Sequence, residues 1–483
     1  MIRYGCLLIL TCLFSFTTAF GQLKIKQIIF PENLITLIQN DSAGKVFVSK
    51  IIIEGNRKTK PEIILREMHC KNGDSIPVAQ LHDVLQEPKS LIYNTNLFSN
   101  VELWAEMPTP YSILIHIRVI ERIYLIPSPE FRLSDRNFNE WWKTYNADLG
   151  RITYGIKLRH NNLTGNGDRM SLYALNGFSR LFSLQYNRPY VDKEMTKGFS
   201  IGLSYARQRD IICKTSYENK ALSYRKDNYI NENFIFQSAY SFRNGYYKKH
   251  QFQMVLQYVN TDDSIIDQKY NPSYFNGSGT SWFIPEFSYS FQYIHTNNIN
   301  YPSDGIILST RISKRGFGWN GGINALMFDG TIKWYNPLNT NWFITLQSSD
   351  KIRLPFKQAF INTQAFGYGD NYLRGLEFRV IDALASSLNK FTLTRKIIDK
   401  RIRIPIKNRY VPFLPIKIYA KTYSDFGYAY HLPEYDTRLN NTLLYTGGLG
   451  LDILSLYDIR TSLEYSFNQL GEKGLFLHMV GLF

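Results

Sequence analysis

The chain has few cysteines, no dense basic run, and none of the local patterns that hold a metal ion. It contains four cysteines in 483 residues, and beyond the N-terminal segment only Cys70 and Cys213 remain. Two distant cysteines do not make a disulfide framework. Without a CxxC pair or a Cys/His cluster there is no indication of a structural metal. The sequence therefore predicts neither a metal nor another cofactor.

Long hydrophobic runs are also missing. Beyond the N-terminus no stretch reaches about 18 consecutive apolar residues, so no transmembrane helix is expected. The opening MIRYGCLLILTCLFSFTTAFGQ combines Arg3, an apolar core over residues 6–16 and small residues around Ala19. This pattern predicts a secretory signal peptide over residues 1–21, with a buried N-terminal helix as the alternative. Residues 22–44 would then form a lead segment of an exported protein.

The net positive charge is not accompanied by a nucleic-acid-binding motif. The formal net charge is +16, but lysines and arginines are scattered among strand-like segments, so no nucleic-acid partner is expected. The eight histidines form no recognisable set with serine and aspartate, and no GxSxG segment occurs. A barrel-embedded lipid hydrolase, which needs an activated serine, is thus the weakest functional alternative.

Aromatic residues are abundant and lie in alternating segments. They make up 15% of the chain, which favours strands and interfacial girdles. In GFSIGLSYARQ (198–208) and TSLEYSF (461–467), apolar residues alternate with small or polar ones. A soluble antiparallel sheet alternates too, but export and the aromatic excess favour a membrane barrel. Residues 124–483 are predicted to form a transmembrane antiparallel β-barrel of about 16 strands.

A small α+β module is predicted over residues 45–123, in the order β-α-α-β-β. A strand ends at Gly55-Asn56, and Thr59 is positioned to cap a helix that has Pro61 in its first turn. A second helix would be interrupted or restarted at Pro88. Two strands follow, over residues 101–106 and 112–121.

Several segments of this module resemble a POTRA domain. They are IIIEGNRKT, NGD, NTNLFSNVEL and IRVIER, in that order. The resemblance implies a periplasmic domain that binds partner polypeptides by adding a strand to its sheet edge. An unrelated α+β domain is the alternative. His69, His82 and His116 are interpreted as surface or packing residues.

One loop carries an arginine motif. LRGLE, with Leu373, Arg374, Gly375 and Leu376, lies in the long irregular segment 353–387. It resembles the sixth extracellular loop of BamA-like proteins, with Leu376 replacing the usual aromatic residue. That resemblance implies a loop folded into the lumen, with its arginine against acids on the barrel wall. The alternative is a solvated surface loop.

Strand alternation supplies candidate partners for this arginine. In IKIYAKTYSDFGYAY (416–430), Asp425 falls on the inward face, and Asp452 and Glu464 are inward by the same parity. A guanidinium in a partly dry lumen requires such carboxylates. We therefore expect a contact between Arg374 and Asp425, with Asp452 or Glu464 as second partners. Thr394 stands where relatives often carry Glu.

The C-terminal Phe483 resembles the sorting signal of outer-membrane barrels, although Gly481 replaces the usual bulky residue.

RITYGIKLRHNNLTGNGD (151–168) and LQYNRPYVD (184–192) resemble early barrel strands of BamA/TamA-like proteins. The resemblance implies an outer-membrane protein that assists barrel insertion or polypeptide translocation. Its expected partners are lipid, unfolded barrel or secreted clients, and accessory periplasmic or lipoprotein subunits. A single POTRA leaves a specialised paralogue or a secretion pore open, and a passive channel is the other class.

Overall fold

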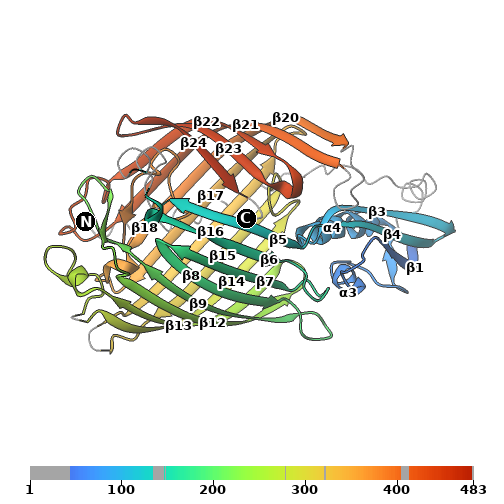
Figure 1. Cartoon of the computed structure of the whole chain (residues 1–483). Coiled ribbons are helices and arrows are strands. Elements are labelled where there is room, and N and C mark those ends of the chain that lie inside the picture. The colour runs from blue at the N-terminus through green and yellow to red at the C-terminus, as the bar shows by residue number, and fades with distance from the viewer. Residues whose placement is uncertain are drawn as a thin grey trace.

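The structure is a computed structural model that describes residues 44–133, 146, 148–277, 279–319, 322–403 and 413–480. The expected signal peptide, nearly all of the lead segment and Phe483 lie outside these residues. The chain folds into a small α+β domain at one end of a slanted barrel of strands (Figure 1). No helix in the described residues is both long and apolar enough to cross a membrane.

The small domain has a sheet of order β2-β1-β4-β3, and its helices share one apolar core with the sheet. Its elements are β1 (Lys45–Glu54), α3 (Pro61–Leu65), β2 (Ser75–Pro77), η1 (Val78–Gln80), α4 (Leu81–Asn94), β3 (Phe98–Thr109) and β4 (Ser112–Glu121). Ile113, Ile115 and Ile117 alternate along β4 and are fully buried, so they form the centre of the core. Strand β3 is an edge of this sheet.

Two local predictions for this domain are wrong. The N-cap of α3 is Lys60, and no side chain caps the helix. The Thr59 hydroxyl instead lies 2.8 Å from the Tyr124 hydroxyl and accepts a hydrogen bond from Asn162. Helix α4 also continues through Pro88 without interruption. Thr59 is drawn away from the helix by its contacts with Tyr124 and Asn162. Helix α4 continues because burial of its apolar face outweighs the local cost of a proline.

The barrel is a single 16-stranded antiparallel sheet, which confirms the predicted architecture. Each strand pairs with the next barrel strand along the chain. The strands are β5 (Leu125–Leu133), β6 (Ile152–His160), β7 (Arg169–Gly177), β8 (Ser179–Arg188), β9 (Lys197–Gln208), β12 (Asn231–Asn244), β13 (Lys248–Thr261), β14 (Ser281–Thr296), β15 (Gly305–Arg315), β16 (Ala325–Pro337), β17 (Trp342–Leu354), β20 (Ala385–Arg403), β21 (Phe413–Tyr430), β22 (Leu443–Leu454), β23 (Arg460–Asn468) and β24 (Lys473–Val480).

The predicted alternation is visible in the exposure of single strands. In β9, Phe199, Ile201 and Leu203 are exposed on the outer face, whereas Gly198 and Gly202 are buried. A large apolar surface of this kind suits lipid, and small or polar residues suit a lumen. The same pattern recurs in β22 and β23.

Short elements occupy the connections at both ends of the barrel. The end away from the small domain carries η2 (Leu149–Arg151), the hairpin β10 (Asp210–Thr215) and β11 (Ala221–Arg225), η3 (Asp263–Ile266), η5 (Phe360–Asn362), β18 (Gln364–Phe366) and β19 (Ile381–Asp382). Turn η6 (Leu456–Asp458) lies at the other end, beside the small domain. The long connection 355–384 between β17 and β20 bears the arginine motif, and we call it the arginine loop.

Candidate functional site

The arginine loop places Arg374 inside the barrel wall against Asp425 of β21. The Arg374 Nε lies 3.1 and 3.0 Å from the two Asp425 carboxylate oxygens, and Nη2 donates to the same carboxylate. The Arg374 backbone N–H also donates to it, at 2.9 Å. Asp425 is fully buried and Arg374 is 8% exposed. A planar guanidinium can hold one carboxylate through two of its nitrogens, which compensates the desolvation of both groups.

The remaining faces of the guanidinium are also occupied. Its carbon lies 3.9 Å from the centre of the Tyr423 ring, within the range of a cation–π contact. Nη1 donates to the Thr392 hydroxyl at 3.0 Å, and Nη2 approaches the Phe391 carbonyl at 3.4 Å. The arginine is therefore held by two neighbouring strands, β20 and β21.

Gly375 lets the loop tip approach the wall closely. Its φ is +93°, and a Cβ atom there would lie 2.9 Å from the Ser466 Cβ of β23. Both the backbone conformation and the space require glycine. On either side, Leu373 and Leu376 are 1% and 3% exposed and belong to an apolar cluster with Phe366 and Leu388. The motif thus combines one ion pair with two apolar anchors.

Asp452 and Glu464, the expected second partners of Arg374, form ion pairs with Lys421 instead. Asp452 and Glu464 each accept a hydrogen bond from the Lys421 ammonium, at 2.6 Å. The strand register explains why these acids bind Lys421 and not Arg374. Lys421 lies opposite Gly450, which in turn lies opposite Glu464. Asp425 lies four residues further along β21, level with the loop tip. The alternation of residues along each strand correctly predicted which side chains point inward. It could not predict their positions along the barrel axis.

Sequence reasoning missed a polar network outside the motif. Asp382 is fully buried in the arginine loop and accepts hydrogen bonds from Thr215 at 2.6 Å, Tyr368 at 2.8 Å and Tyr435. These donors come from the β10–β11 hairpin, the arginine loop itself and the β21–β22 connection. Asn219 joins the same segments through the Val380 carbonyl. The loops interlock, and no local sequence pattern signals such long-range contacts.

At the opposite end, the small domain is fixed to the barrel rim by a buried ion pair. Glu67 is 1% exposed and binds Arg243 of β12 through both carboxylate oxygens, at 2.5 and 2.8 Å. Arg243 also donates to the Tyr190 hydroxyl at 2.6 Å. Further along the rim, Asn94 of α4 donates to the Thr296 carbonyl at 2.9 Å. The domain is in this way joined to two consecutive turns of the rim, β12–β13 and β14–β15.

The other side of the small domain is held by turn η6. Tyr93 donates to Asp458 at 2.7 Å, and the Arg122 guanidinium lies 5.3 Å from the centre of the Tyr457 ring. Burial and the neighbouring Asp458 carboxylate raise the pKa of Tyr93 above its ordinary value, so the phenol remains a donor. The Ile123 N–H donates to the Tyr457 hydroxyl at 3.1 Å, which places the start of β5 beside the β22–β23 turn.

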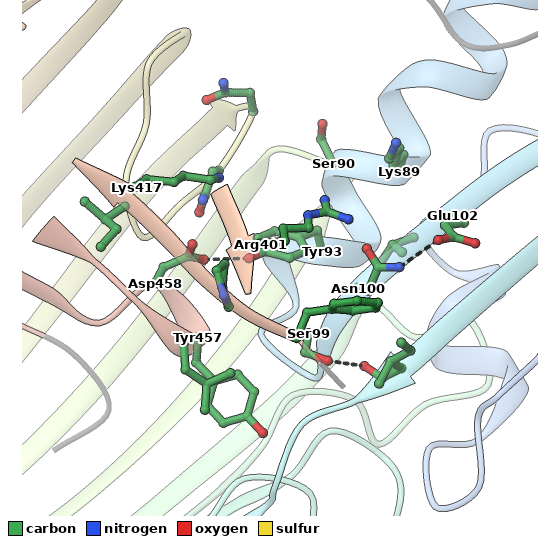
Figure 2. Close-up of a pocket in the computed structure, with 18 of the residues that line it drawn as sticks. Lys89, Ser90, Tyr93, Ser99, Asn100, Glu102, Arg401, Lys417, Tyr457 and Asp458 are labelled. Carbon is green, nitrogen blue, oxygen red and sulfur yellow. Dashed lines mark hydrogen bonds between the residues drawn. The ribbon is translucent and has the colours of Figure 1, made fainter. Parts of the chain in front are cut away.

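A pocket of about 680 Å³ lies between the small domain and this part of the rim (Figure 2). Helix α4 contributes Lys89, Ser90 and Tyr93 on one side, and the barrel contributes Lys417, Tyr457 and Asp458 on the other (Figure 2). The first residues of the edge strand β3, Ser99 to Glu102, also line it.

The pocket has an excess of positive charge. Lys89, Arg401 and Lys417 line it and form no ion pair with any residue in the described part of the chain. Its two acids, Glu102 and Asp458, already accept hydrogen bonds from Asn100 and Tyr93. Such a lining attracts carboxylates, and its position makes the edge strand accessible from the rim.

Comparison with known proteins agrees with this architecture. Residues 162–379 match the Omp85 superfamily domain, and residues 46–122 match a POTRA domain described as a surface antigen variable number repeat. No curated protein sequence matches the chain. The solved structure of BamA from Haemophilus ducreyi lacking POTRA domains 1–3 is similar, with 15% identity, a TM-score of 0.50, and coverage of 90% of this chain and 84% of that one.

CdiB from Escherichia coli has 12% identity and a TM-score of 0.52, with coverage of 89% of this chain and 75% of that one. At these identities the two structures establish a shared fold. Together these findings define an outer-membrane β-barrel with a POTRA domain in the periplasm. The chain carries an Omp85 superfamily domain and a POTRA domain and is BamA/TamA-like. BamA and CdiB mediate β-barrel insertion or polypeptide translocation across the outer membrane.

Proposed function

We propose that this protein guides extended polypeptides from the periplasm to a seam in its barrel wall, where they insert into or cross the outer membrane. The observation that carries the proposal is the pair of end strands. Among the described residues no ladder joins β5 to β24, so each has one edge without a strand partner. Unpaired edges are templates for an added strand.

The POTRA domain supports the entry step. Its edge strand β3 begins in the basic pocket beside the rim. An extended client can pair with β3 through its backbone while its carboxylates face Lys89 and Lys417. Folding of the client in the membrane supplies the free energy, so no catalytic chemistry is required and we propose that the protein is not an enzyme.

Arg374 and its motif have a bracing role in this proposal. The ion pair with Asp425 and the apolar anchors Leu373 and Leu376 tie the arginine loop to β20 and β21. A wall braced on the β24 side of the seam allows β5 and β24 to separate without collapse of the lumen. Lys421, with Asp452 and Glu464, extends the brace to β22 and β23.

The proposed division of the chain follows from the same scheme. Residues 1–21 are the signal peptide, 22–44 the lead segment, 45–123 the POTRA domain and 124–483 the barrel. Phe483 is the proposed sorting signal. Accessory periplasmic or lipoprotein subunits are proposed to deliver clients to the POTRA edge.

Depletion of the protein followed by quantitative proteomics of the outer membrane and medium tests the function. We expect the level of at least one β-barrel or exported protein to decrease several-fold. Unchanged levels of all of them, together with steady ion conductance of the purified protein in liposomes, would instead support a passive channel.

Site-specific photo-crosslinking tests the route. A crosslinker at position 102, in the pocket, and one at position 475, on β24, should capture a client during its assembly. A crosslinker at position 252, exposed on the outer face of β13 away from the seam, is the matched control. Equal capture at all three positions would contradict a defined route.

A further inference from the structure

A mixed cluster of one histidine and two glutamates lies where the arginine loop meets the last two strands. Glu377 comes from the loop, Glu464 from β23 and His478 from β24, and their side-chain ligand atoms all lie within 4.8 Å of one another. The His478 Nε2 atom is 3.1 Å from a Glu377 oxygen and 3.7 Å from the Glu464 Oε2 atom. No short sequence motif contains these residues, because the fold alone brings them together.

One ligand atom of this cluster has no hydrogen-bond partner. Glu464 is 4% exposed, and its Oε1 atom accepts a hydrogen bond from Lys421 at 2.6 Å. Its Oε2 atom is buried, has no hydrogen-bond partner in the described structure, and points toward His478. A buried carboxylate oxygen without a donor is costly unless a cation approaches it.

The cluster has charged neighbours of both signs. Glu377, Glu464 and Asp452 contribute three negative charges, of which Lys421 compensates one through its hydrogen bonds to Asp452 and Glu464. Lys390, positioned over the Tyr372 ring, is a further positive neighbour, and Arg460 interacts with both Asp452 and Tyr372. Arg374 is already paired with Asp425 and adds little net charge.

We propose that Glu377, Glu464 and His478 bind a divalent transition-metal ion, with Zn²⁺ as the best fit. One imidazole nitrogen and two carboxylate oxygens are ligands that Zn²⁺ accepts in tetrahedral sites, with water in the fourth position. Lys421 fixes one oxygen of Glu464 and leaves the other for the metal. The Tyr372 ring stacks on His478, with centroids 5.6 Å apart, and orients the imidazole. Supporting contacts of this kind hold metal ligands in place.

The site would fasten the seam. A metal ion bound to these ligands joins the arginine loop to β23 and to β24, the end strand of the sheet. It would therefore hold one side of the seam to the loop until the ion is released. This inference depends on the fold alone and stands whether or not the proposed client route is correct.

The test uses the full chain, purified in detergent and freed of metal with a chelator. Zn²⁺ alone is added, excess is removed by dialysis, and bound zinc is measured per chain by mass spectrometry. Co²⁺ in a parallel sample reports the ligand geometry through its visible spectrum. We expect about one zinc per chain, with at least a tenfold loss of affinity in His478→Ala and Glu377→Gln. Mg²⁺ should not compete.

Glu472→Gln is the matched control, because Glu472 is a nearby acid that binds Arg379 and Asn468 outside the cluster. Correct folding of each variant is checked by its heat-dependent mobility on gels, and Glu377→Gln, which alters only a loop, remains informative if His478→Ala fails to fold. Wild-type protein that retains no zinc, or variants that retain as much as wild type, would overturn the proposal.

Discussion

At the scale of single residues, Arg374 and Asp425 show how a charged pair can be kept inside a barrel wall. Each group is almost fully buried, and each is acceptable only because the other is present. The backbone N–H of Arg374 also binds the carboxylate, so the pair fixes the position of the loop as well as its charge.

Replacement of Arg374 is expected to destabilise the loop strongly. Arg374→Ala leaves Asp425 buried without its cation, which costs about 3–5 kcal/mol. Arg374→Lys keeps the charge but loses the planar contact with the carboxylate and the Tyr423 ring, so it should rescue only in part. Hydrogen exchange in residues 367–380 measures the effect. Arg379→Ala, an arginine of the same loop with half-exposed partners, is the control; an equal effect would contradict the brace.

A second residue predicts a pH response at the far end of the barrel. His431 follows β21 and stacks on Tyr435, with ring centroids 4.0 Å apart. Burial lowers the pKa of His431 to about 4, below the ordinary value near 6.5. Its contribution to stability is therefore complete above about pH 6.5 and is lost as the pH falls toward 4.

Acidification from pH 7 to pH 5 should cost this loop about 1–2 kcal/mol. Hydrogen exchange in residues 431–442, corrected for the intrinsic pH effect, should increase accordingly. His431→Phe keeps the ring contact but cannot be protonated, so its exchange should not change with pH in this way. A variant as pH-sensitive as the wild type would assign the response to another group.

At the scale of elements, the tip of the arginine loop depends on Gly375. Gly375→Ala introduces a Cβ at φ +93° and 2.9 Å from the Ser466 Cβ, so we expect the loop to lose about 1–3 kcal/mol. Gly369→Ala is the control, because Gly369 has φ +76° but no atom within 4 Å of a built Cβ. Its loss should be smaller, and heat-dependent gel mobility compares the two. Equal losses would mean that the cost comes from the positive φ alone and not from the close approach to Ser466.

The elements also show what the sequence could and could not predict. Alternation identified strands and their inward faces, because a period of two is a local property. The resemblance placed the arginine loop inside the lumen. Neither could assign Asp452 and Glu464 to Lys421, because that choice depends on the register of three strands. The hydrogen bond between Thr59 and Asn162 is likewise a long-range contact that no local pattern predicts.

At the scale of the whole molecule, the Glu67–Arg243 pair joins the POTRA domain to the barrel. Removal of one partner leaves a buried charge, so Glu67→Gln and Arg243→Gln should each weaken docking by about 3–5 kcal/mol. In the double variant the losses should not add, because both single changes remove the same contact. Limited proteolysis of the folded protein measures the release of the domain.

The exposed pair Glu54–Arg118 is the matched control for this prediction, since its side chains are about half exposed. Glu54→Gln should cost less than about 1 kcal/mol. Additive losses in the Glu67 and Arg243 double variant would show that the two residues stabilise the protein separately.

The contact between Tyr93 and Asp458 has a consequence for biogenesis. The two residues are 365 positions apart, so the domain translated first obtains part of its support from one of the last hairpins. Until that hairpin closes, Tyr93 and Arg122 lack their acceptor and stacking partner on the rim. A POTRA domain that is docked on both sides is therefore possible only after this late hairpin has formed, whereas the contacts with β12 and β14 can form earlier.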